Sequence, residues 1–266
     1  MEYKNIIFNK ENHIATITLN RPDKLNALNE KMTEEIAHAL VDIGKDDNMR
    51  VLVITGSGRA FCAGADLREE EGEAMLQLSH AESIRLAVRE MSKGCIEGLI
   101  NLPQPTIAMV NGACVGAGFD LALACDIRVG SDKARFMVAY SRVGIIPGQG
   151  GAWMLAKIAG LPKAAELLFT GDFLNAEDAE KWGVINKLVP SSDLEKETMA
   201  MATRISKMPP LAVRINKMHL YRMLQMDLAS ALDFAAATQP ILLTSEDYKE
   251  AVNSFMEKRE GIFKGR

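Results

Sequence analysis

The segment TIAMVNGACVGAGFDLALACD, residues 106–126, decides the fold class of this chain. It opens with a continuous apolar run, TIAMVNG (106–112), which is typical of a strand covered on both faces. Glycines and alanines follow, and FDLALACD then reads as the start of a helix. A buried strand that passes through a loop of small residues into a helix predicts an α/β fold.

A second segment repeats this local plan. The apolar run VLVITG (51–56) leads into SGRAFCAGADL (57–67), which is again a loop of small residues before an expected helix. Small residues let a ligand approach the backbone closely, and a helix N-terminus presents unpaired N–H groups with a partial positive charge. Two such loops that converge would form an oxyanion hole for the enolate of a thioester. The same residues also suit two ordinary strand-to-helix turns, and their spacing alone leaves both interpretations open.

The rest of the chain alternates strands and helices and ends in a helical tail. HIATITLN (13–20) alternates as a half-buried strand does, and DIRVGS (126–131) is another predicted strand. Met32, Ile36, Leu40 and Ile43 line one face of a predicted helix over residues 30–46. Further helices are predicted over 150–160, 161–171, 175–183, 193–206 and 211–260. The tail must bury its apolar face on the core or on a partner subunit.

Composition excludes several classes of protein. The 266 residues are 48% hydrophobic and 25% charged with a net charge of −4, an ordinary globular balance without a global basic field for nucleic acid or membranes. No apolar run reaches the roughly 18 residues of a membrane helix, and the first residues lack the features of a signal peptide. The four cysteines form neither a CxxC pair nor a Cys/His cluster, so we expect no metal site, no disulfide framework and a cytoplasmic location.

Five segments carry a resemblance to a known family. They are LNRPDKLNALN (19–29), GRAFCAGADL (58–67), NGACVGAGFDLALACDIRVGSDKARF (111–136), VGIIPGQGG (143–151) and EDYKEAVNSFMEKREGIFKGR (246–266). In this order, over nearly the whole chain, they resemble the crotonase (enoyl-CoA hydratase/isomerase) superfamily. The resemblance implies an α/β fold in which a ββα spiral core, residues 1–200, binds acyl-CoA. Residues 201–266 would form a helical C-terminal trimerisation region that also contacts CoA.

The resemblance also assigns the catalytic positions. The oxyanion N–H groups would come from Ala65 and from Ala117, where the family usually has glycine. Asp120 stands at the first of the two glutamates that family hydratases use to add water, although it is one methylene shorter; alternatively it only caps its helix. Tyr140 stands at the second, and because a phenol is a poor base at neutral pH it would donate a hydrogen bond or simply line the pocket.

Coenzyme A contacts follow from the same resemblance. The positions that match are Lys24, Leu25, Ala63, Ala65, Asp66, Leu67, Arg68, Phe255 and Lys258. Taken alone, Lys258 would be a solvated charge on a helix. His80 lies in the polar stretch that lines the acyl pocket in the family, but a lone histidine is more often structural.

The missing second glutamate leaves the reaction open. Hydration or dehydration of an enoyl-CoA, with Asp120 as the main acid/base and Tyr140 orienting the water, is the first interpretation, on an unusual cyclic or conjugated substrate. Double-bond isomerisation and C–C bond hydrolysis also need only one carboxylate and the same enolate. A non-catalytic acyl-CoA-binding protein is an alternative of another class. We expect no permanently bound cofactor, and a homo-oligomer that is a trimer or a dimer of trimers.

Overall fold

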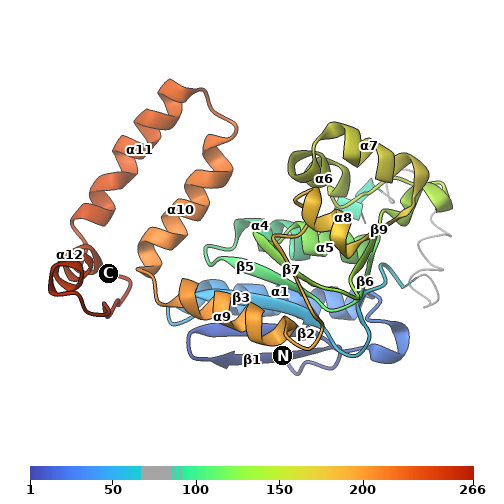
Figure 1. Cartoon of the computed structure of the whole chain (residues 1–266), viewed down its shortest axis with the longest axis horizontal. Helices are drawn as coiled ribbons and strands as arrows, with labels where there is room; N and C mark the ends of the chain where they lie inside the picture. The colour runs from blue at the N-terminus through green and yellow to red at the C-terminus, as the bar shows by residue number, and fades with distance from the viewer. Residues whose placement is uncertain (67–84, 87, 90–91) are drawn as a thin grey trace.

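The computed structural model describes residues 1–66, 85–86, 88–89 and 92–266 of the chain (Figure 1). Its main sheet has six strands in the order β1 (Ile6–Glu11), β2 (Ile14–Leu19), β3 (Val51–Gly56), β5 (Thr106–Val110), β7 (Ile127–Ser131) and β10 (Lys187–Val189). Only β1 is antiparallel to its neighbour; the other pairs are parallel. A smaller sheet holds β4 (Ala60–Cys62), β6 (Ala113–Val115), β8 (Arg135–Met137) and β9 (Phe173–Asn175).

The two sheets are joined by repeated turns of a spiral. A long strand of the main sheet leads into a short strand of the smaller sheet in three pairs: β3 into β4, β5 into β6, and β7 into β8. Each of the first two connections needs a glycine, because a Cβ on Gly56 or on Gly112 would lie 2.3 or 2.1 Å from a backbone carbonyl oxygen. This arrangement confirms the predicted ββα spiral.

The main sheet is covered on both faces. Alternate residues of β3 face opposite ways: Val51 and Val53 pack with α9 (Leu194–Ser206), while Leu52 and Ile54 belong to the larger core. Helices α1 (Glu30–Lys45) and α5 (Ala117–Leu123) pack into that larger core. Burial on both faces explains why β3 and β5 are continuous apolar runs.

The other helices that the structure describes in the core are short. They are η1 (Pro22–Lys24), η2 (Lys93–Glu97), α4 (Gly98–Asn101), η3 (Ala139–Val143), α6 (Gly151–Ala159), α7 (Leu161–Thr170) and α8 (Ala176–Lys181). As predicted, Gly160 ends α6, Gly171 ends α7 and Asn175 caps α8, its side chain accepting from Asp178 N–H.

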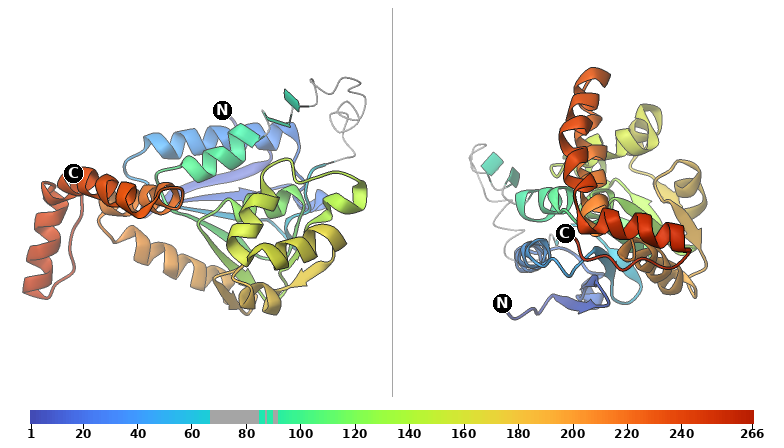
Figure 2. Two further views of the ribbon diagram at one scale, coloured as in Figure 1. Left: turned by 90° about the horizontal axis from the view of Figure 1, so that it is seen from above. Right: turned by 90° about the vertical axis from the view of Figure 1, so that its left-hand side faces the viewer.

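The C-terminal helices project from one end of the core (Figures 1 and 2). The periodic stretch 211–260 is three helices, α10 (Pro210–Met223), α11 (Leu228–Leu243) and α12 (Glu246–Glu257), because Asp227 and Ser245 each cap a new helix. The expected division at residue 200 falls inside α9, which runs unbroken to Ser206, so the projecting part begins after that helix.

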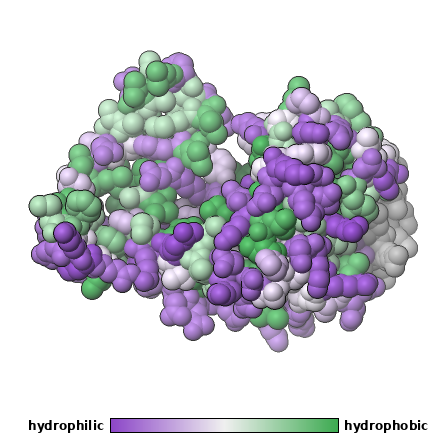
Figure 3. All heavy atoms as spheres, viewed as in Figure 1, coloured by the Kyte–Doolittle hydropathy of each residue, from purple (hydrophilic) through white to green (hydrophobic). Residues whose placement is uncertain are grey.

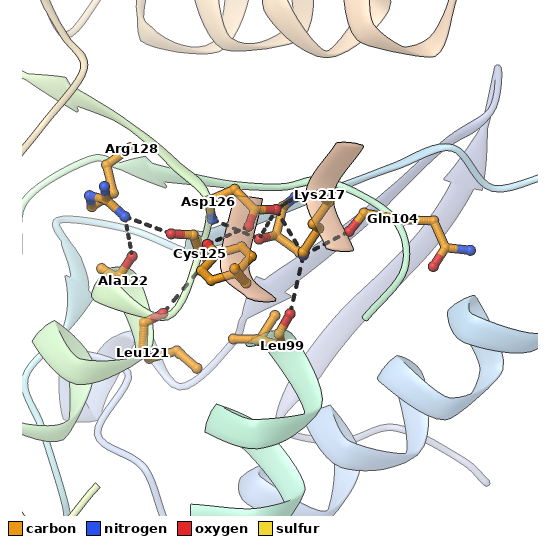
Figure 4. Close-up of polar contacts among 10 residues, drawn as sticks. Leu99, Gln104, Leu121, Ala122, Cys125, Asp126, Arg128 and Lys217 are labelled. Carbon is orange, nitrogen blue, oxygen red and sulfur yellow. Dashed lines mark hydrogen bonds and ion pairs between the residues drawn. The ribbon is translucent and has the colours of Figure 1, made fainter. Parts of the chain in front are cut away.

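A buried ion pair joins the projecting helices to the core. Lys217 of α10 lies 2.8 Å from Asp126 Oδ2, and its ammonium also donates to the carbonyl oxygens of Leu99 and Gln104 (Figure 4). Tyr221, one turn further along α10, donates to Asp126 Oδ1 at 2.7 Å. Two residues on the same face of α10 therefore fix its direction relative to the end of α5.

The outer surface of the projecting helices is partly apolar, as the green areas over them show (Figure 3). Leu224, Leu228 and Phe255 are 70%, 75% and 81% exposed. None of the helices in the described residues has both the length and the apolar character required to cross a membrane.

Candidate active site

In the first small-residue loop, residues 57–67, the N–H group of Ala65 points away from the neighbouring backbone. Ala65 forms a single parallel bridge with Leu28, in which Leu28 N–H donates to Gly64 and Asp66 N–H donates to Leu28, both at 2.8 Å. In a parallel bridge the central residue makes neither bond itself. The N–H of Ala65 therefore points to the other side of this loop, where the residue is exposed.

The second loop begins α5. Gly116, with φ of 53°, is the N-cap, and its carbonyl accepts from the N–H groups of Phe119 and Asp120. Ala117 is therefore in the first turn, where backbone N–H groups have no partner within the helix. The two loops touch, since a Cβ on Gly64 would lie 3.7 Å from Ala117 N and 3.0 Å from Val115 O. The structure thus brings together the two backbone segments that the sequence predicted to converge.

Asp120 and Tyr140 meet beside these loops. The Tyr140 hydroxyl, carried by η3, donates to Asp120 Oδ2 at 2.7 Å. Asp120 is only 2% exposed and is the fourth residue of α5. The alternative that it caps the helix is wrong, because Gly116 holds that position.

The surroundings of Asp120 favour proton transfer near neutral pH. Burial raises the pKa of Asp120 to about 7, and the hydrogen bond from Tyr140 opposes that rise. Burial also raises the pKa of Tyr140, and the nearby Asp120 carboxylate raises it further. Asp120 can therefore both accept and release a proton at pH 7, while Tyr140 stays a neutral donor.

Several of the residues matched to CoA contacts lie around the first loop. Leu25 has φ of 51°, and its carbonyl accepts from Ala63 N–H at 3.0 Å, so the segments holding Lys24 and Ala65 run side by side. Asp66 pairs with Arg21 at 3.0 Å. Leu67, Arg68 and His80 lie outside the described residues.

Phe255 and Lys258 lie elsewhere in the chain. Both belong to the end of α12, at the opposite end of the molecule from α5 and β6 (Figures 1 and 2). The structure therefore does not bring them to the Ala65 loop of the same chain.

A cavity of about 470 Å³ adjoins the site between η2 and α6. Its walls include Ile96, Ile100, Trp153 and Met154, and Gly150 lies at its edge. Gly150 precedes Gly151, and a Cβ on Gly151 would meet the Asp120 carboxyl group. The sequence predicted the helix over 150–160 but indicated no functional role for it.

Other candidate groups have structural partners. Arg142 pairs with exposed Asp172 at 3.2 Å, as expected of a surface arginine. Cys62 is fully buried, which raises its thiol pKa to about 12 and argues against a nucleophilic role. Within the part of the chain that the structure describes, His, Cys, Asp and Glu side chains form no group of three that could hold a metal ion.

Comparison with known proteins identifies the family. The sequence pattern of the family described as Enoyl-CoA hydratase/isomerase matches residues 9–266. The chain is 34% identical to 1,2-epoxyphenylacetyl-CoA isomerase of Escherichia coli (strain K12), over 98% of each protein. It is 35% identical to the short-chain-enoyl-CoA hydratase of Clostridium acetobutylicum, over 98% of this chain and 97% of that protein.

A solved structure agrees in fold. The enoyl-CoA hydratase from Bacillus anthracis superposes with a TM-score of 0.92 at 34% identity, covering 99% of this chain and 100% of that one. The chain therefore belongs to the enoyl-CoA hydratase/isomerase family of enzymes, the crotonase superfamily.

Proposed function

We propose that this enzyme adds water to, or removes water from, an enoyl-CoA thioester, with Asp120 as its acid/base. The observation that carries the proposal is the 2.7 Å hydrogen bond from Tyr140 to Asp120, on the helix that Ala117 begins. The thioester oxygen would accept from the N–H groups of Ala65 and Ala117. These donors would stabilise the negative charge that the enolate places on that oxygen.

Asp120 would carry the proton through both halves of the reaction. Its carboxylate accepts a proton from water as the water oxygen bonds to C3, and the double-bond electrons move onto the thioester oxygen as an enolate. The protonated Asp120 then gives that proton to C2, and the carbonyl forms again. Tyr140 keeps Oδ2 engaged, which leaves Oδ1 for the transfer.

Isomerisation is the second candidate. Tyr140 donates a hydrogen bond to Asp120. Because a phenol is not a carboxylate, Asp120 is the one carboxylate of this pair. A single carboxylate suffices to take a proton from C4 and return it to C2 through a dienolate. A relative that matches this chain over 98% of its length is named 1,2-epoxyphenylacetyl-CoA isomerase; its substrate is an epoxide, so it supports isomerisation as a reaction class and not the double-bond shift itself. Hydrolysis of a C–C bond would use the same enolate and remains a third outcome of the test below.

A cyclic or conjugated acyl group suits the cavity beside the site. Trp153 offers the ring face that Lys157 does not cover, and Ile96, Ile100 and Met154 add apolar walls to a volume of about 470 Å³. Flat rings pack favourably on such a face. The lining of this cavity also includes the charged residues Arg85, Arg89 and Glu97. A substrate panel in which straight-chain crotonyl-CoA is clearly the best substrate would remove this part of the proposal.

Coenzyme A would lie along the first loop, near Lys24, Leu25, Ala63, Asp66, Leu67 and Arg68. Because Phe255 and Lys258 lie at the far end of the chain, they would reach the CoA of a neighbouring copy in a trimer or a dimer of trimers. No permanently bound cofactor enters this scheme. The four cysteines are free, buried thiols, which is compatible with a cytoplasmic enzyme.

The deciding experiment incubates the enzyme and Asp120→Asn with linear and cyclic enoyl-CoAs in deuterated water and analyses the products by mass spectrometry. A product heavier by one water supports hydration, and deuterium uptake or a shifted double bond without added water supports isomerisation. Hydrolysed or ring-opened products support C–C cleavage. Asp120→Asn should abolish each of these while acyl-CoA still binds. If wild-type enzyme binds the esters tightly and changes none of them, the chain is an acyl-CoA-binding protein.

A further inference from the structure

The first residue of α6 lies directly against Asp120. A Cβ built on Gly151 would be 1.9 Å from Asp120 Oδ1, 2.7 Å from its Cγ and 3.1 Å from Oδ2. These are the three heavy atoms nearest to that Cβ, and all belong to one carboxyl group. No side chain, not even a methyl group, fits between α6 and Asp120 as they stand.

The backbone conformation does not explain this glycine. The glycines with positive φ include Gly144, Gly150 and Gly160, which flank or precede helices, but not Gly151. Any residue can adopt a helical conformation at the first position of a helix, and alanine is better suited to it than glycine. What requires glycine at this position is the space taken by the Asp120 carboxyl group.

The carboxyl group is thus held on two sides. Tyr140 donates to Oδ2, and Oδ1 lies in van der Waals contact with the Gly151 backbone. Among the described residues, the titratable groups around the Asp120 carboxyl group are the Tyr140 hydroxyl from η3 and two buried thiols. The thiols are those of Cys62 in β4 and Cys114 in β6. Burial raises the pKa of both thiols, so they stay neutral, and α6 presents only the glycine backbone to Oδ1.

We propose that Gly151 is a positioning residue for Asp120. Because Gly151 has no side chain, the Asp120 carboxyl group fits against α6 in a space that excludes water. This space, called the slot below, sets the direction of Oδ1 and the protonation of the carboxyl group. This inference rests on the proposed function, in which Asp120 transfers the proton. It adds that the slot is sized for aspartate. A larger residue at position 151, or a longer acid at position 120, would force the carboxyl group out of line.

Gly151→Ala tests the proposal. We expect kcat to fall by about tenfold to a hundredfold, because a displacement on the order of 1 Å costs that much in proton transfer. KM for the CoA thioester should change by less than about threefold, since the loops that would hold it are untouched. The midpoint of the acidic limb of the pH–rate profile should move to lower pH, because burial is what raises the pKa of Asp120 and a displaced carboxyl group regains water.

Gly44→Ala is the matched control. Gly44 lies in α1, and a Cβ there would meet Leu102 Cδ1 at 3.6 Å, an ordinary contact. Its kcat, KM and pH midpoint should equal those of the wild type. If Gly151→Ala lowers the melting temperature but leaves the pH midpoint and kcat per folded molecule unchanged, Gly151 is merely structural and the proposal is overturned.

Asp120→Glu tests the same space by lengthening the acid instead of adding a side chain at position 151. It keeps the acid but adds a methylene that must enter the gap before Gly151, so we expect at least about a tenfold loss of kcat. It also serves if Gly151→Ala does not fold, and wild-type activity in this variant would overturn the proposal. Asp120→Asn separates the two ideas. An active Asp120→Asn refutes the proposed function, whereas an inactive one beside a wild-type-like Gly151→Ala refutes only the role of Gly151.

Discussion

Asp120 lies in an environment that opposes stability and favours chemistry. Its pKa is about 7 in the folded chain and near 3.8 when unperturbed. Between these values the native state holds a proton that the unfolded state has released, so the free energy of unfolding falls as pH rises from about 4 to about 7. At about 1.4 kcal/mol per pKa unit, the cost above pH 7 is roughly 4 kcal/mol. The buried acid is therefore a site where stability and activity conflict.

Asp120→Asn should consequently stabilise the fold at alkaline pH. Asparagine has nearly the same shape, can still accept from Tyr140 and carries no charge to bury. Urea unfolding should show a gain of up to about 4 kcal/mol over wild type at pH 8, and little difference at pH 4. Equal or lower stability of the variant at pH 8 would mean that Asp120 ionises at its ordinary pH.

Tyr140→Phe tests whether the Tyr140 hydroxyl takes part in catalysis or the side chain only lines the pocket. The hydrogen bond from Tyr140 lowers the pKa of Asp120, so its loss should raise that pKa further. The midpoint of the acidic limb should move to higher pH, and kcat at pH 7 should fall about tenfold as less carboxylate is present. A pH–rate profile identical to that of the wild type would make Tyr140 a wall of the pocket only.

Sequence reasoning reached these two residues, but not the third that surrounds the carboxyl group. The family resemblance indicated Asp120 and Tyr140 by their positions, and the structure shows a hydrogen bond between them. Gly151 was predicted only as part of the helix over 150–160, and the sequence indicated no functional role for it. Which face of α6 meets Asp120 depends on how two helices pack, and no local pattern encodes that.

At the scale of single elements, segments with a clear apolar pattern or clear cap residues were predicted, and three-residue strands were not. The runs that became β2, β3, β5 and β7 and the amphipathic α1 follow from burial on one or both faces. Strands β4, β6, β8, β9 and β10 have three residues each, too few for a period to show. Strand β1 was missed because only Ile6 of its six residues is buried, so it lacks alternation.

The position of α10 depends on one buried cation. Lys217→Met should lower the free energy of unfolding by up to about 3 kcal/mol, because it leaves the largely buried Asp126 carboxylate without its ion pair. Urea unfolding measures this loss. Lys181→Met is the matched control, since the Lys181–Asp178 pair is on the surface and is worth less than about 1 kcal/mol. Similar effects of the two changes would show that Asp126 is already satisfied by Thr106 and Tyr221.

At the scale of the whole molecule, two features bear on the proposed association of copies. Its projecting helices expose large apolar side chains, and monomeric proteins rarely expose large contiguous apolar patches; among these side chains are Leu224, Leu228, Leu232 and Phe255. Residues matched to CoA contacts lie at both ends of the chain, on the Ala65 loop and on α12. Association of copies through α10 to α12 would cover the exposed apolar side chains. It would also bring α12 of one copy to the CoA bound at the Ala65 loop of another.

Light scattering on wild type and on the double variant Leu228→Asp, Leu232→Asp tests this association. We expect three or six times the mass of one chain for the wild type and a single chain for the variant, because two buried carboxylates would oppose the contact. Val41→Asp introduces one carboxylate at an exposed residue of α1, away from these helices, and should keep the wild-type mass. If Phe255 and Lys258 serve a neighbour, the monomeric variant should also bind acyl-CoA about tenfold more weakly, as Lys258→Ala should in the intact assembly. A wild type that is monomeric and binds acyl-CoA tightly would instead place every CoA contact within one chain and leave α12 without a part in binding.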